Sequence, residues 1–512
     1  MENEKNSIEN IPTNISENDK PSHFSKNVIT LVGGTALAQI ITFLASPIIT
    51  RLYGPDAFGI LALFTSITGI FAVIACLRYE LAIMLPKSDK EAANILGLCL
   101  LIVVFISILS IPFLILSQQI LIQSLKISQL EPYFWFIPLS TFLSGIFLAM
   151  EYWNSRTKHF YRLSTIRVFK SVSTKGIQIG VGSAGFASGG TLISANIFGQ
   201  IVSTSILGLQ ILKEHQSFFK QNITIKGMVA AFKLYIKFPK FDIWSALLGT
   251  ISSMLPIFIL SAYFNPSIVG YYSLSLMVLQ LPMSLIGSAI GQVFFQKAAE
   301  AKNISQKKLR DMVEKPLKPL IFLVYFPTIL LILIGPELFG AVFGLNWMES
   351  GNYARYMALW MSIGFISSPI STLFTIFQEQ RFTLFFNIFQ MVFRIIALLI
   401  GGILGDALIS IILFSIVGCI SNTIALLYLL KLSNTSIIEP VKIVLNFFFL
   451  SIPFIILVMI FQKMFFSNIF LIVILSLLVS LLYYVVVLKK DPELLGFLRQ
   501  ISSQIPVIKN YI

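Results

Sequence analysis

The chain has 512 residues, of which 56% are hydrophobic and 12% charged, and its mean hydropathy is +0.85. Values this apolar exclude an ordinary soluble globular protein and indicate an integral membrane protein. A formal net charge of +14 can accompany nucleic-acid binding, but in this composition it favours a topological charge bias and contact with anionic lipid.

The N-terminal residues 1–26 are rich in Asn, Glu, Ser and Lys, and they lack the apolar core and cleavage site of a signal peptide. They predict a disordered tail. A bilayer core about 30 Å thick needs about 20 apolar residues per helical span, and about fourteen stretches meet this length. The sequence therefore predicts an all-α integral membrane protein, with spans near 27–50, 58–79, 92–117, 132–151, 164–182, 189–212, 241–263, 268–295, 317–336, 353–376, 382–403, 407–430, 441–461 and 468–488.

The spans divide into two blocks of six, with a polar linker between them and two spans left over. The predicted units are an N-lobe at 27–212, a linker at 213–240, a C-lobe at 241–430, a helix pair at 441–488 and a tail at 489–512. Most Lys and Arg residues outside the spans fall in alternate loops, whereas the other loops hold only Arg51, Lys126, Arg355 and Lys463. By the positive-inside rule, the basic loops and both termini face the cytoplasm.

Two short segments mark the same place in the two blocks. RLYGPDAFG at 51–59 and AYFNPSIVG at 262–270 each lie between the first and second span of a block. At one fixed offset, the paired residues are Tyr53, Pro55 and Gly59 with Phe264, Pro266 and Gly270. Proline can begin the second helix and glycine allows close helix packing. Since each block has an even number of spans, the repeats are parallel, as in several secondary transporters.

Residues typical of enzymes and metal sites are missing or isolated. Cys76, Cys99 and Cys419 lie singly inside spans, without metal or disulfide spacing. No phosphate-binding loop of the G-x-x-x-x-G-K-[ST] type occurs. The glycine-rich run at 180–190 predicts a turn, and the longest outer loop, 337–352, is short. We therefore expect neither an enzyme nor a metal or cofactor site, although a membrane-embedded polysaccharide polymerase or ligase stays as an alternative.

Polar stripes follow three of the spans at helical spacing, where positions three, four, seven and eleven apart share a face. They predict the wall of a cleft between the lobes, although small and hydroxyl residues also serve ordinary helix packing. The stripe residues are Thr35, Gln39, Thr42, Ser46 and Thr50 on the first span, Asp242, Ser245, Gly249, Ser252 and Ser253 on the seventh, and Gln280, Ser284, Ser288 and Gln292 on the eighth.

Charges inside spans are the sharper signal, because Lys or Arg at the bilayer centre costs about 2.5 to 3.5 kcal/mol and must face protein or water. Lys170, Lys175 and Arg394 lie deepest. On the fifth span, Arg167, Lys170, Ser171, Thr174, Lys175 and Gln178 fall within an arc of about 140°. Asn387, Gln390 and Arg394 likewise share one face of the eleventh span.

Carboxylates, by contrast, are absent from the middle of every predicted span. The candidate coupling or gating charges Glu80, Glu151 and Asp242 lie near cytoplasmic ends, as does Arg78. An exporter of cationic drugs needs an acid within the membrane, so this absence argues against one. A cleft lined by Lys, Arg, Gln and Asn suits an anion that bears hydroxyl groups, because phosphate pairs with ammonium and guanidinium.

Two N-terminal segments resemble the polysaccharide flippases of the Wzx type, which belong to the multidrug/oligosaccharidyl-lipid/polysaccharide exporter superfamily. The segments are GGTALAQIITFLASPIITRLYGPDAFGILALFTSI and CLRYELAIMLPKSDKEA. Beyond them, only length, span number and the two-block pattern agree. The match is carried by Gly54, Pro55, Phe58 and Gly59 in the first outer loop and by Arg78, Glu80, Ala82 and Pro86.

This resemblance implies two six-helix lobes in a V, alternating access, and a substrate that is an undecaprenyl-diphosphate-linked oligosaccharide such as the O-antigen repeat unit of lipopolysaccharide. Such a flippase moves the unit from the inner to the outer leaflet of a bacterial cytoplasmic membrane. Its cationic cavity would correspond in kind to Lys170, Lys175 and Arg394, with Arg78 and Arg167 as further candidates.

The resemblance leaves several questions open. The coupling ion, H⁺ or Na⁺, is not identified by the sequence. Membrane lipid is an expected partner, and a polysaccharide polymerase and chain-length proteins are candidates. A lipid II flippase and a cation-coupled drug exporter of the same superfamily stay as alternatives, and so does a non-transporting partner in glycan assembly.

Overall fold

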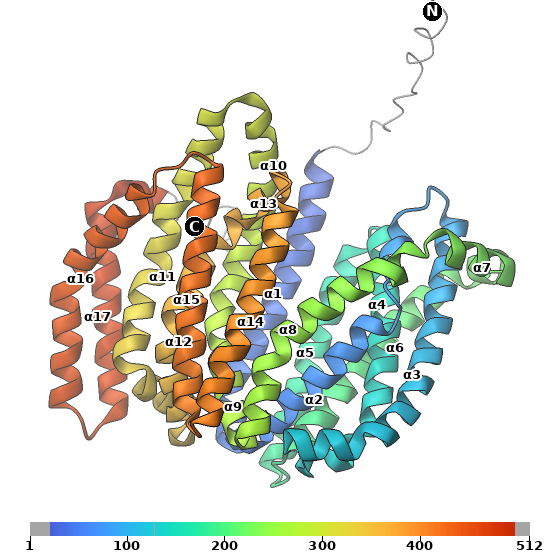
Figure 1. The fold of residues 1–512 in the computed structure, drawn as a ribbon, viewed down its shortest axis with the longest axis horizontal. Coiled ribbons are helices and arrows are strands. Elements are labelled where there is room, and N and C mark those ends of the chain that lie inside the picture. The colour runs from blue at the N-terminus through green and yellow to red at the C-terminus, as the bar shows by residue number, and fades with distance from the viewer. Residues whose placement is uncertain (1–20, 127, 497–512) are drawn as a thin grey trace, which may run out of the picture.

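The computed structural model describes residues 21–126 and 128–496, apart from the side chains of 21–32, 288, 289, 292, 293, 296 and 303. Within this part all regular structure is helical, and no β-strand occurs there (Figure 1). The predicted all-α class is confirmed.

The first six long helices form one group, the N-lobe. They are α1 (Pro21–Leu52), α2 (Pro55–Ile74), α3 (Asp89–Leu125), α4 (Phe136–Arg156), α5 (Phe160–Ser183) and α6 (Gly189–Asn222). Two short helices, η1 (Tyr79–Met84) and η2 (Ser128–Tyr133), lie between them. The helix α7 (Ile225–Leu234) follows in the linker.

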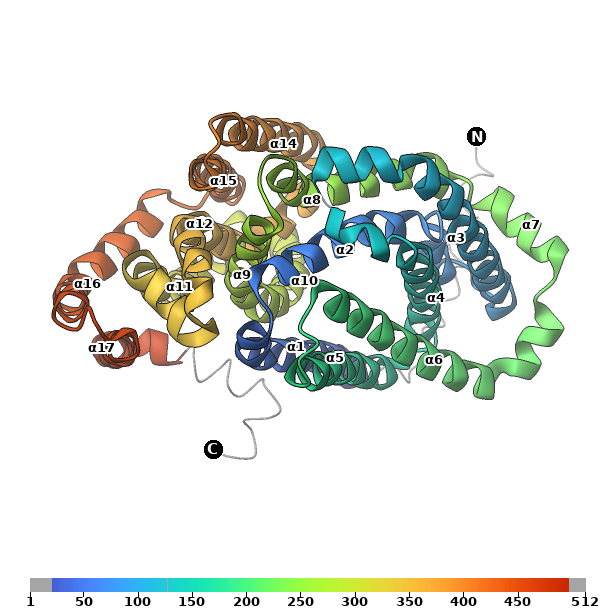
Figure 2. The same cartoon turned by 90° about the horizontal axis from the view of Figure 1, so that it is seen from below.

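The second group is the C-lobe, and a further helix pair lies at its outer edge (Figure 2). The C-lobe contains η3 (Phe238–Asp242), α8 (Ile243–Tyr263), α9 (Pro266–Pro282), η4 (Met283–Gly287), α10 (Ser288–Ile304), α11 (Gln306–Phe343), η5 (Leu345–Trp347), α12 (Met348–Ser367), η6 (Pro369–Thr372), α13 (Leu373–Ile376), α14 (Gln380–Ile403) and α15 (Ala407–Leu432). The outer pair is α16 (Ile438–Met464) and α17 (Ile469–Lys490).

Twelve described helices are long and apolar enough to cross a membrane, and the bent pair Leu345–Ser367 and Pro369–Ile376, with 47° between its parts, makes thirteen. The remaining predicted span is α5. Its 24 residues include Arg162, Arg167, Lys170 and Lys175, and these charges keep it below the hydropathy of a lipid-facing span. At 1.5 Å per residue it is about 36 Å long, and it packs along α1. The predicted count of about fourteen agrees with this arrangement.

Several boundaries differ from the expected ones. Helix α1 begins at Pro21, so residues 21–26 of the predicted tail are helical, while 1–20 and 497–512 lie outside the described residues. The predicted outer loop 337–352 is mostly helical, because α11 continues to Phe343 and a single residue, Gly344 at φ 108°, separates it from η5. The expected turn within 180–190 is present between α5 and α6, where Gly185 has φ 93°.

Two reciprocal contacts join the lobes at the end of the molecule where α2 and α9 begin. We call it the opposite end, because it lies opposite the hairpin between α10 and α11 (Figure 1). Pro55 and Pro266 are the first residues of these helices, as the repeat predicts. A Cβ added to Gly59 would overlap the carbonyl oxygen of Pro266, and one added to Gly270 would overlap that of Pro55. Each glycine is therefore required for the other lobe's proline turn to approach.

A second repeated contact lies within each lobe, between its first and fifth spans. A Cβ on Gly182 would lie 2.7 Å from the Tyr53 ring, and a Cβ on Gly402 would lie 2.6 Å from the Tyr263 ring. By packing, the counterpart of Tyr53 is thus Tyr263, one residue before the Phe264 with which the sequence aligns it. This contact also identifies α5 and α14 as equivalent helices.

Candidate functional site

A cavity of about 510 Å³ lies between the lobes. Helices α1, α5 and α6 of the N-lobe form one wall, and the end of α9 with η4 of the C-lobe forms the other. The predicted site residues in its lining are Gln39, Thr42, Arg167, Lys170, Thr174, Lys175 and Gln280. The structure therefore brings together the basic face of the fifth span and two of the predicted polar stripes.

The three cations of the lining differ in how their charge is balanced. The Arg167 guanidinium pairs with the carboxylate of Glu151 and donates to Thr35 Oγ1. Lys175 Nζ donates to Gln178 Oε1 at 2.9 Å, and Lys170 Nζ lies 5.7 Å from the centre of the Phe147 ring. Within the described part of the chain neither lysine has an acidic partner, and no carboxylate lines the cavity.

Packing between α1 and α5 fixes the direction of this basic face. Ser171 Oγ lies 3.0 Å from Thr42 Oγ1 and donates to the carbonyl of Ala38 at 3.0 Å. These contacts orient α5 so that Lys170 and Lys175 stand along one wall of the cavity. Two ammonium groups beside amides and hydroxyls form a site for an anionic, hydrogen-bonding ligand.

Arg394 lies elsewhere. Its guanidinium carbon is 5.3 Å from the Trp360 ring and 5.2 Å from the Phe414 ring, inside the C-lobe. It is not among the described residues that line the cavity. Asn387 and Gln390 lie on the same helix, α14, and they are not among the described residues that line the cavity either.

The other predicted lining residues are dispersed. Ser46 is buried and donates to the carbonyl of Phe43 at 2.6 Å, whereas Ser245 is exposed on α8. Gln178 is buried next to the cavity as the partner of Lys175. The side chains of Ser288 and Gln292 lie outside the described residues.

Arg78 is engaged in an ion pair that links the two lobes. Its Nε donates to Asp242 Oδ2 at 2.7 Å, and its Nη1 lies 3.3 Å from Glu80 Oε1. Glu80 is only 1% exposed. Burial raises the pKa of the Glu80 carboxyl, although hydrogen bonding to backbone and the charge of Arg78 oppose the shift. Arg78 precedes η1 in the N-lobe and Asp242 precedes α8, so this trio spans the lobes.

Further inter-lobe hydrogen bonds, which the sequence did not reveal, close the opposite end. Trp347 Nε1 donates to the carbonyl of Thr50 at 2.8 Å, and Arg51 Nη2 donates to that of Ala341 at 2.9 Å. Trp347 is fully buried and packs edge-on against Phe58. The only sequence signal for this contact was a tryptophan in a predicted outer loop.

A family model described as "Polysaccharide biosynthesis protein" matches residues 48–352, which include the α2–α9 contact, the Arg78 ion pair and the basic face of α5. The chain belongs to this polysaccharide biosynthesis family. No curated protein sequence matches the chain.

Solved structures share the fold of this polysaccharide biosynthesis protein at low sequence identity. The lipid II flippase MurJ in an inward closed conformation is 16% identical, with a TM-score of 0.64 over 90% of this chain and 99% of that one. An inward-facing multidrug resistance MATE family transporter of the MOP superfamily is 15% identical, with a TM-score of 0.60 over 78% and 96%. A mutant of the Vibrio cholerae MATE transporter VcmN is 13% identical, with a TM-score of 0.51 over 82% and 99%. The predicted resemblance is confirmed at the level of the fold and of the polysaccharide biosynthesis family.

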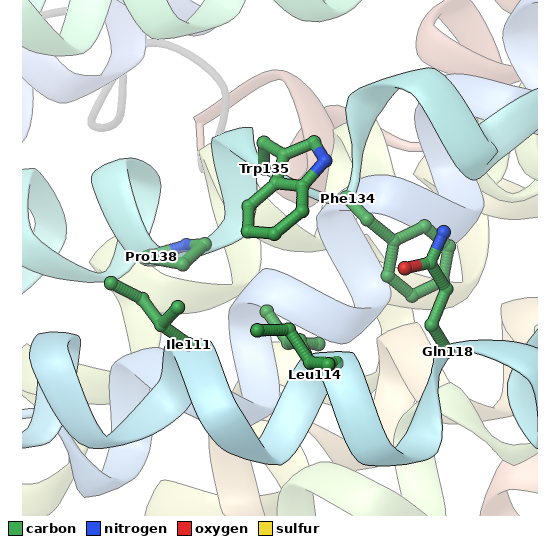
Figure 3. A pocket seen from close by; sticks show the side chains of 7 residues that line it. Ile111, Leu114, Gln118, Phe134, Trp135 and Pro138 are labelled. Atoms are coloured by element: carbon green, nitrogen blue, oxygen red, sulfur yellow. The ribbon is translucent and has the colours of Figure 1, made fainter.

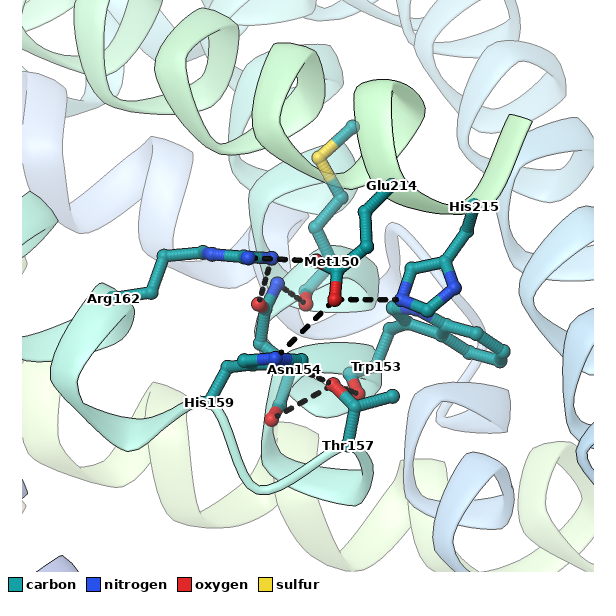
Figure 4. A network of polar contacts seen from close by, with 8 residues as sticks. All are labelled: Met150, Trp153, Asn154, Thr157, His159, Arg162, Glu214 and His215. Carbon is teal, nitrogen blue, oxygen red and sulfur yellow. Dashed lines mark hydrogen bonds and ion pairs between the residues drawn. The ribbon is translucent and has the colours of Figure 1, made fainter.

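Two other features of the polysaccharide biosynthesis protein lie apart from the cavity. A pocket of about 10 Å³ between α3 and α4 is lined mainly by apolar side chains, including Leu114 and Trp135 (Figure 3), and is too small for more than a water-sized probe. A polar network joins α4, α5 and α6 (Figure 4). There Glu214 accepts from Arg162 Nη2 at 2.7 Å and lies 3.4 Å from His159 Nε2.

Proposed function

We propose that this protein is a flippase that moves a polyprenyl-diphosphate-linked oligosaccharide, of the O-antigen repeat-unit class, across a bacterial cytoplasmic membrane. The observation that carries the proposal is the pair Lys170 and Lys175, which stand without acidic partners among the described residues in a cavity between two lobes. Family membership supports a role in polysaccharide biosynthesis.

The proposed binding mode assigns each part of the substrate to a surface. The diphosphate lies between the Lys170 and Lys175 ammonium groups, because neither group forms an ion pair with a described carboxylate. The amides of Gln39 and Gln280, on opposite walls, hydrogen-bond to sugar hydroxyls. The polyprenyl tail stays in lipid beside the lobes. Arg167 is not assigned to the diphosphate, since Glu151 already pairs with it.

The orientation follows from the charge distribution. Seven of the Lys and Arg residues fall at 297–318, on the hairpin that joins α10 and α11, and six lysines fall at 213–240 around α7. We call the end that carries η1, α7 and this hairpin the basic end, and we assign it to the cytoplasm by the positive-inside rule. The cavity then receives substrate from the inner leaflet while the Trp347 and Arg51 bonds close the outer side.

Movement between inward-facing and outward-facing states requires these contacts to exchange. The opposite end opens when the bonds from Trp347 and Arg51 break and the lobes part at the α2–α9 crossing that holds Gly59 and Gly270. At the basic end, the Arg78–Asp242 pair joins the lobes, and Glu80 competes for the same guanidinium. We assign coupling to these charges, with H⁺ favoured over Na⁺ because burial raises the pKa of the Glu80 carboxyl.

The test uses a host strain from which the gene is deleted. Loss of surface polysaccharide with accumulation of complete, unpolymerised lipid-linked units on the inner leaflet supports translocation. A variant with Lys170 and Lys175 changed to Gln should not restore the polysaccharide, whereas a control with Lys307 and Lys308 changed to Gln, which removes equal charge from the hairpin, should. Units that reach the outer leaflet but stay unpolymerised would refute the proposal and indicate a polymerase.

A lipid II flippase is the second candidate. The likeness to MurJ extends over 90% of this chain, against 78% for the MATE transporter. Complementation separates the two candidates, because only a lipid II flippase would sustain growth of cells depleted of their own. Polysaccharide polymerase and chain-length proteins are the partners expected of the first candidate alone.

A further inference from the structure

The linker helix α7 lies across the spans and at the edge of the molecule. Figure 2 shows α7 lengthwise, in the view in which α15, α16 and α17 are seen end-on. Contacts with the beginning of α3 fix the depth of α7 relative to the membrane, because Gly227 packs against Asn94 and Met228 packs against Gly97. Asn94 lies two turns or fewer from the start of α3 at Asp89, so α7 runs at the level where a span leaves the membrane.

Hydrogen bonds fix α7 to the N-lobe along one side. Asn94 Oδ1 accepts from the backbone N–H of Thr224 at 2.9 Å, and Thr224 Oγ1 caps the helix by accepting from Gly227 N. The Tyr79 hydroxyl donates to the carbonyl of Phe232 at 2.9 Å, and the two rings stack. Because both ends are held, the orientation of the outer side of α7 is determined.

That outer side is apolar and largely exposed, although one face of the Phe232 ring stacks on Tyr79. Ile225, Val229 and Phe232, at spacings of four and three residues, are 77%, 48% and 42% exposed. They share one helix face. Leu234 beyond them and Phe241 after the helix are also exposed. An apolar face of this kind on an integral membrane protein, at the level of a span end, is matched by the acyl-chain boundary.

Basic side chains border this face along the chain. Lys226 and Lys233 flank the apolar residues at helical spacing, and Lys237 and Lys240 follow. All four are exposed. Residues 215–241 contain no Asp or Glu. Lysine next to exposed apolar residues on a short surface helix is the pattern of an interfacial anchor that prefers anionic lipid.

We infer that α7 is an interfacial anchor that binds anionic phospholipid headgroups through Lys226, Lys233, Lys237 and Lys240, with Ile225, Val229 and Phe232 immersed at the acyl-chain boundary. The charge complementarity selects a phosphate-bearing lipid surface over an acidic protein, because the apolar face and the lysines lie together at membrane depth. Since α7 is fixed to the N-lobe and continues through η3 into α8, the anchor holds the linker between the lobes at the membrane surface. The inference does not depend on what the cavity transports.

The test places a nitroxide spin label at Val229→Cys in the full chain, with Cys419→Ser to leave only the buried Cys76 and Cys99. The protein is reconstituted in nanodiscs of phosphatidylcholine with or without phosphatidylglycerol. Collision rates with oxygen and with a water-soluble nickel chelate report immersion. We expect the oxygen-to-nickel ratio to rise severalfold when phosphatidylglycerol is present and to fall again at high salt.

Two charge variants make the test specific. Changing Lys226, Lys233, Lys237 and Lys240 to Gln should abolish the response to phosphatidylglycerol. The matched control changes Lys297, Lys307, Lys308 and Lys315 on the α10–α11 hairpin, which removes the same charge at exposed sites, and it should keep the response. A label that stays accessible to nickel in both lipids would overturn the inference and leave the face for a protein partner. An equal response in both variants would overturn the assignment to these lysines.

Discussion

The crossing of α2 and α9 makes a quantitative prediction for Gly59→Ala. The new Cβ would lie 2.7 Å from the carbonyl carbon of Pro266, besides overlapping its oxygen. Ordinary carbon contacts are about 3.5–4.0 Å, so the backbones must separate by about 1 Å. No flexible side chain can absorb the overlap, because the obstacle is backbone. Overpacking of this kind costs about 1–3 kcal/mol.

Gly69→Ala is the matched control, because it lies on the same helix and a Cβ there has nothing within 4 Å. Alanine is favoured over glycine in a helix by about 1 kcal/mol, so this variant should be as stable as the wild type or slightly more stable. In detergent, the unfolding temperature of Gly59→Ala should be several degrees below those of the wild type and of Gly69→Ala.

The double variant of Gly59 and Gly270 probes whether the two contacts form one crossing. Once the helices have separated to fit one alanine, the second alanine should lower the stability less than it does as a single substitution. The double variant should therefore lose less stability than the sum of the two single variants. Equal unfolding temperatures for Gly59→Ala and Gly69→Ala would refute the packing argument. Fully additive losses would refute the idea of a single shared crossing.

Three further predictions concern single side chains. Trp347→Phe leaves the buried carbonyl of Thr50 without its donor and should cost about 1–3 kcal/mol of stability in chemical unfolding; no loss would show that the bond does not hold the opposite end closed. Arg394→Gln removes contacts with two rings, worth about 0.5–2 kcal/mol. It should lower the unfolding temperature and leave substrate affinity nearly unchanged. Lys175→Gln should lower substrate affinity and leave the unfolding temperature nearly unchanged. Burial raises the pKa of Glu80, so its contribution to stability is complete below the ordinary value of 4.5 and is lost as pH rises through the raised pKa. The stability of Glu80→Gln relative to the wild type should therefore improve as pH rises over that window. A difference in stability that does not change with pH would contradict the assignment.

The sequence predicts the spans and the start of the repeat well, because both depend on local properties. Apolar runs have the length of the bilayer core, and Pro55 and Pro266 can begin helices wherever they occur. The basic face of α5 is also a local property, since helical spacing alone places Lys170 and Lys175 at the two edges of one arc of about 140°.

Directions and long-range partners could not be predicted from the sequence. Helical spacing shows that Arg394 shares a face with Gln390, but not that this face packs against Trp360 and Phe414. Arg78 and Asp242 are 164 residues apart, and nothing local distinguishes their pairing from exposure to water. The exact partners of Gly59 and Gly270 likewise depend on how the two lobes meet.

The central claim is that Lys170 and Lys175 bind the diphosphate of a lipid-linked glycan and carry it across the membrane. The most direct measurement reconstitutes the purified protein in liposomes with a fluorescent polyprenyl-diphosphate oligosaccharide and follows quenching by a membrane-impermeant reductant. The wild type and the Lys307 and Lys308 control should expose the whole pool of substrate, and the variant with Lys170 and Lys175 changed to Gln should expose only the half that starts in the outer leaflet. Equal exposure in the lysine variant and the wild type would contradict the account.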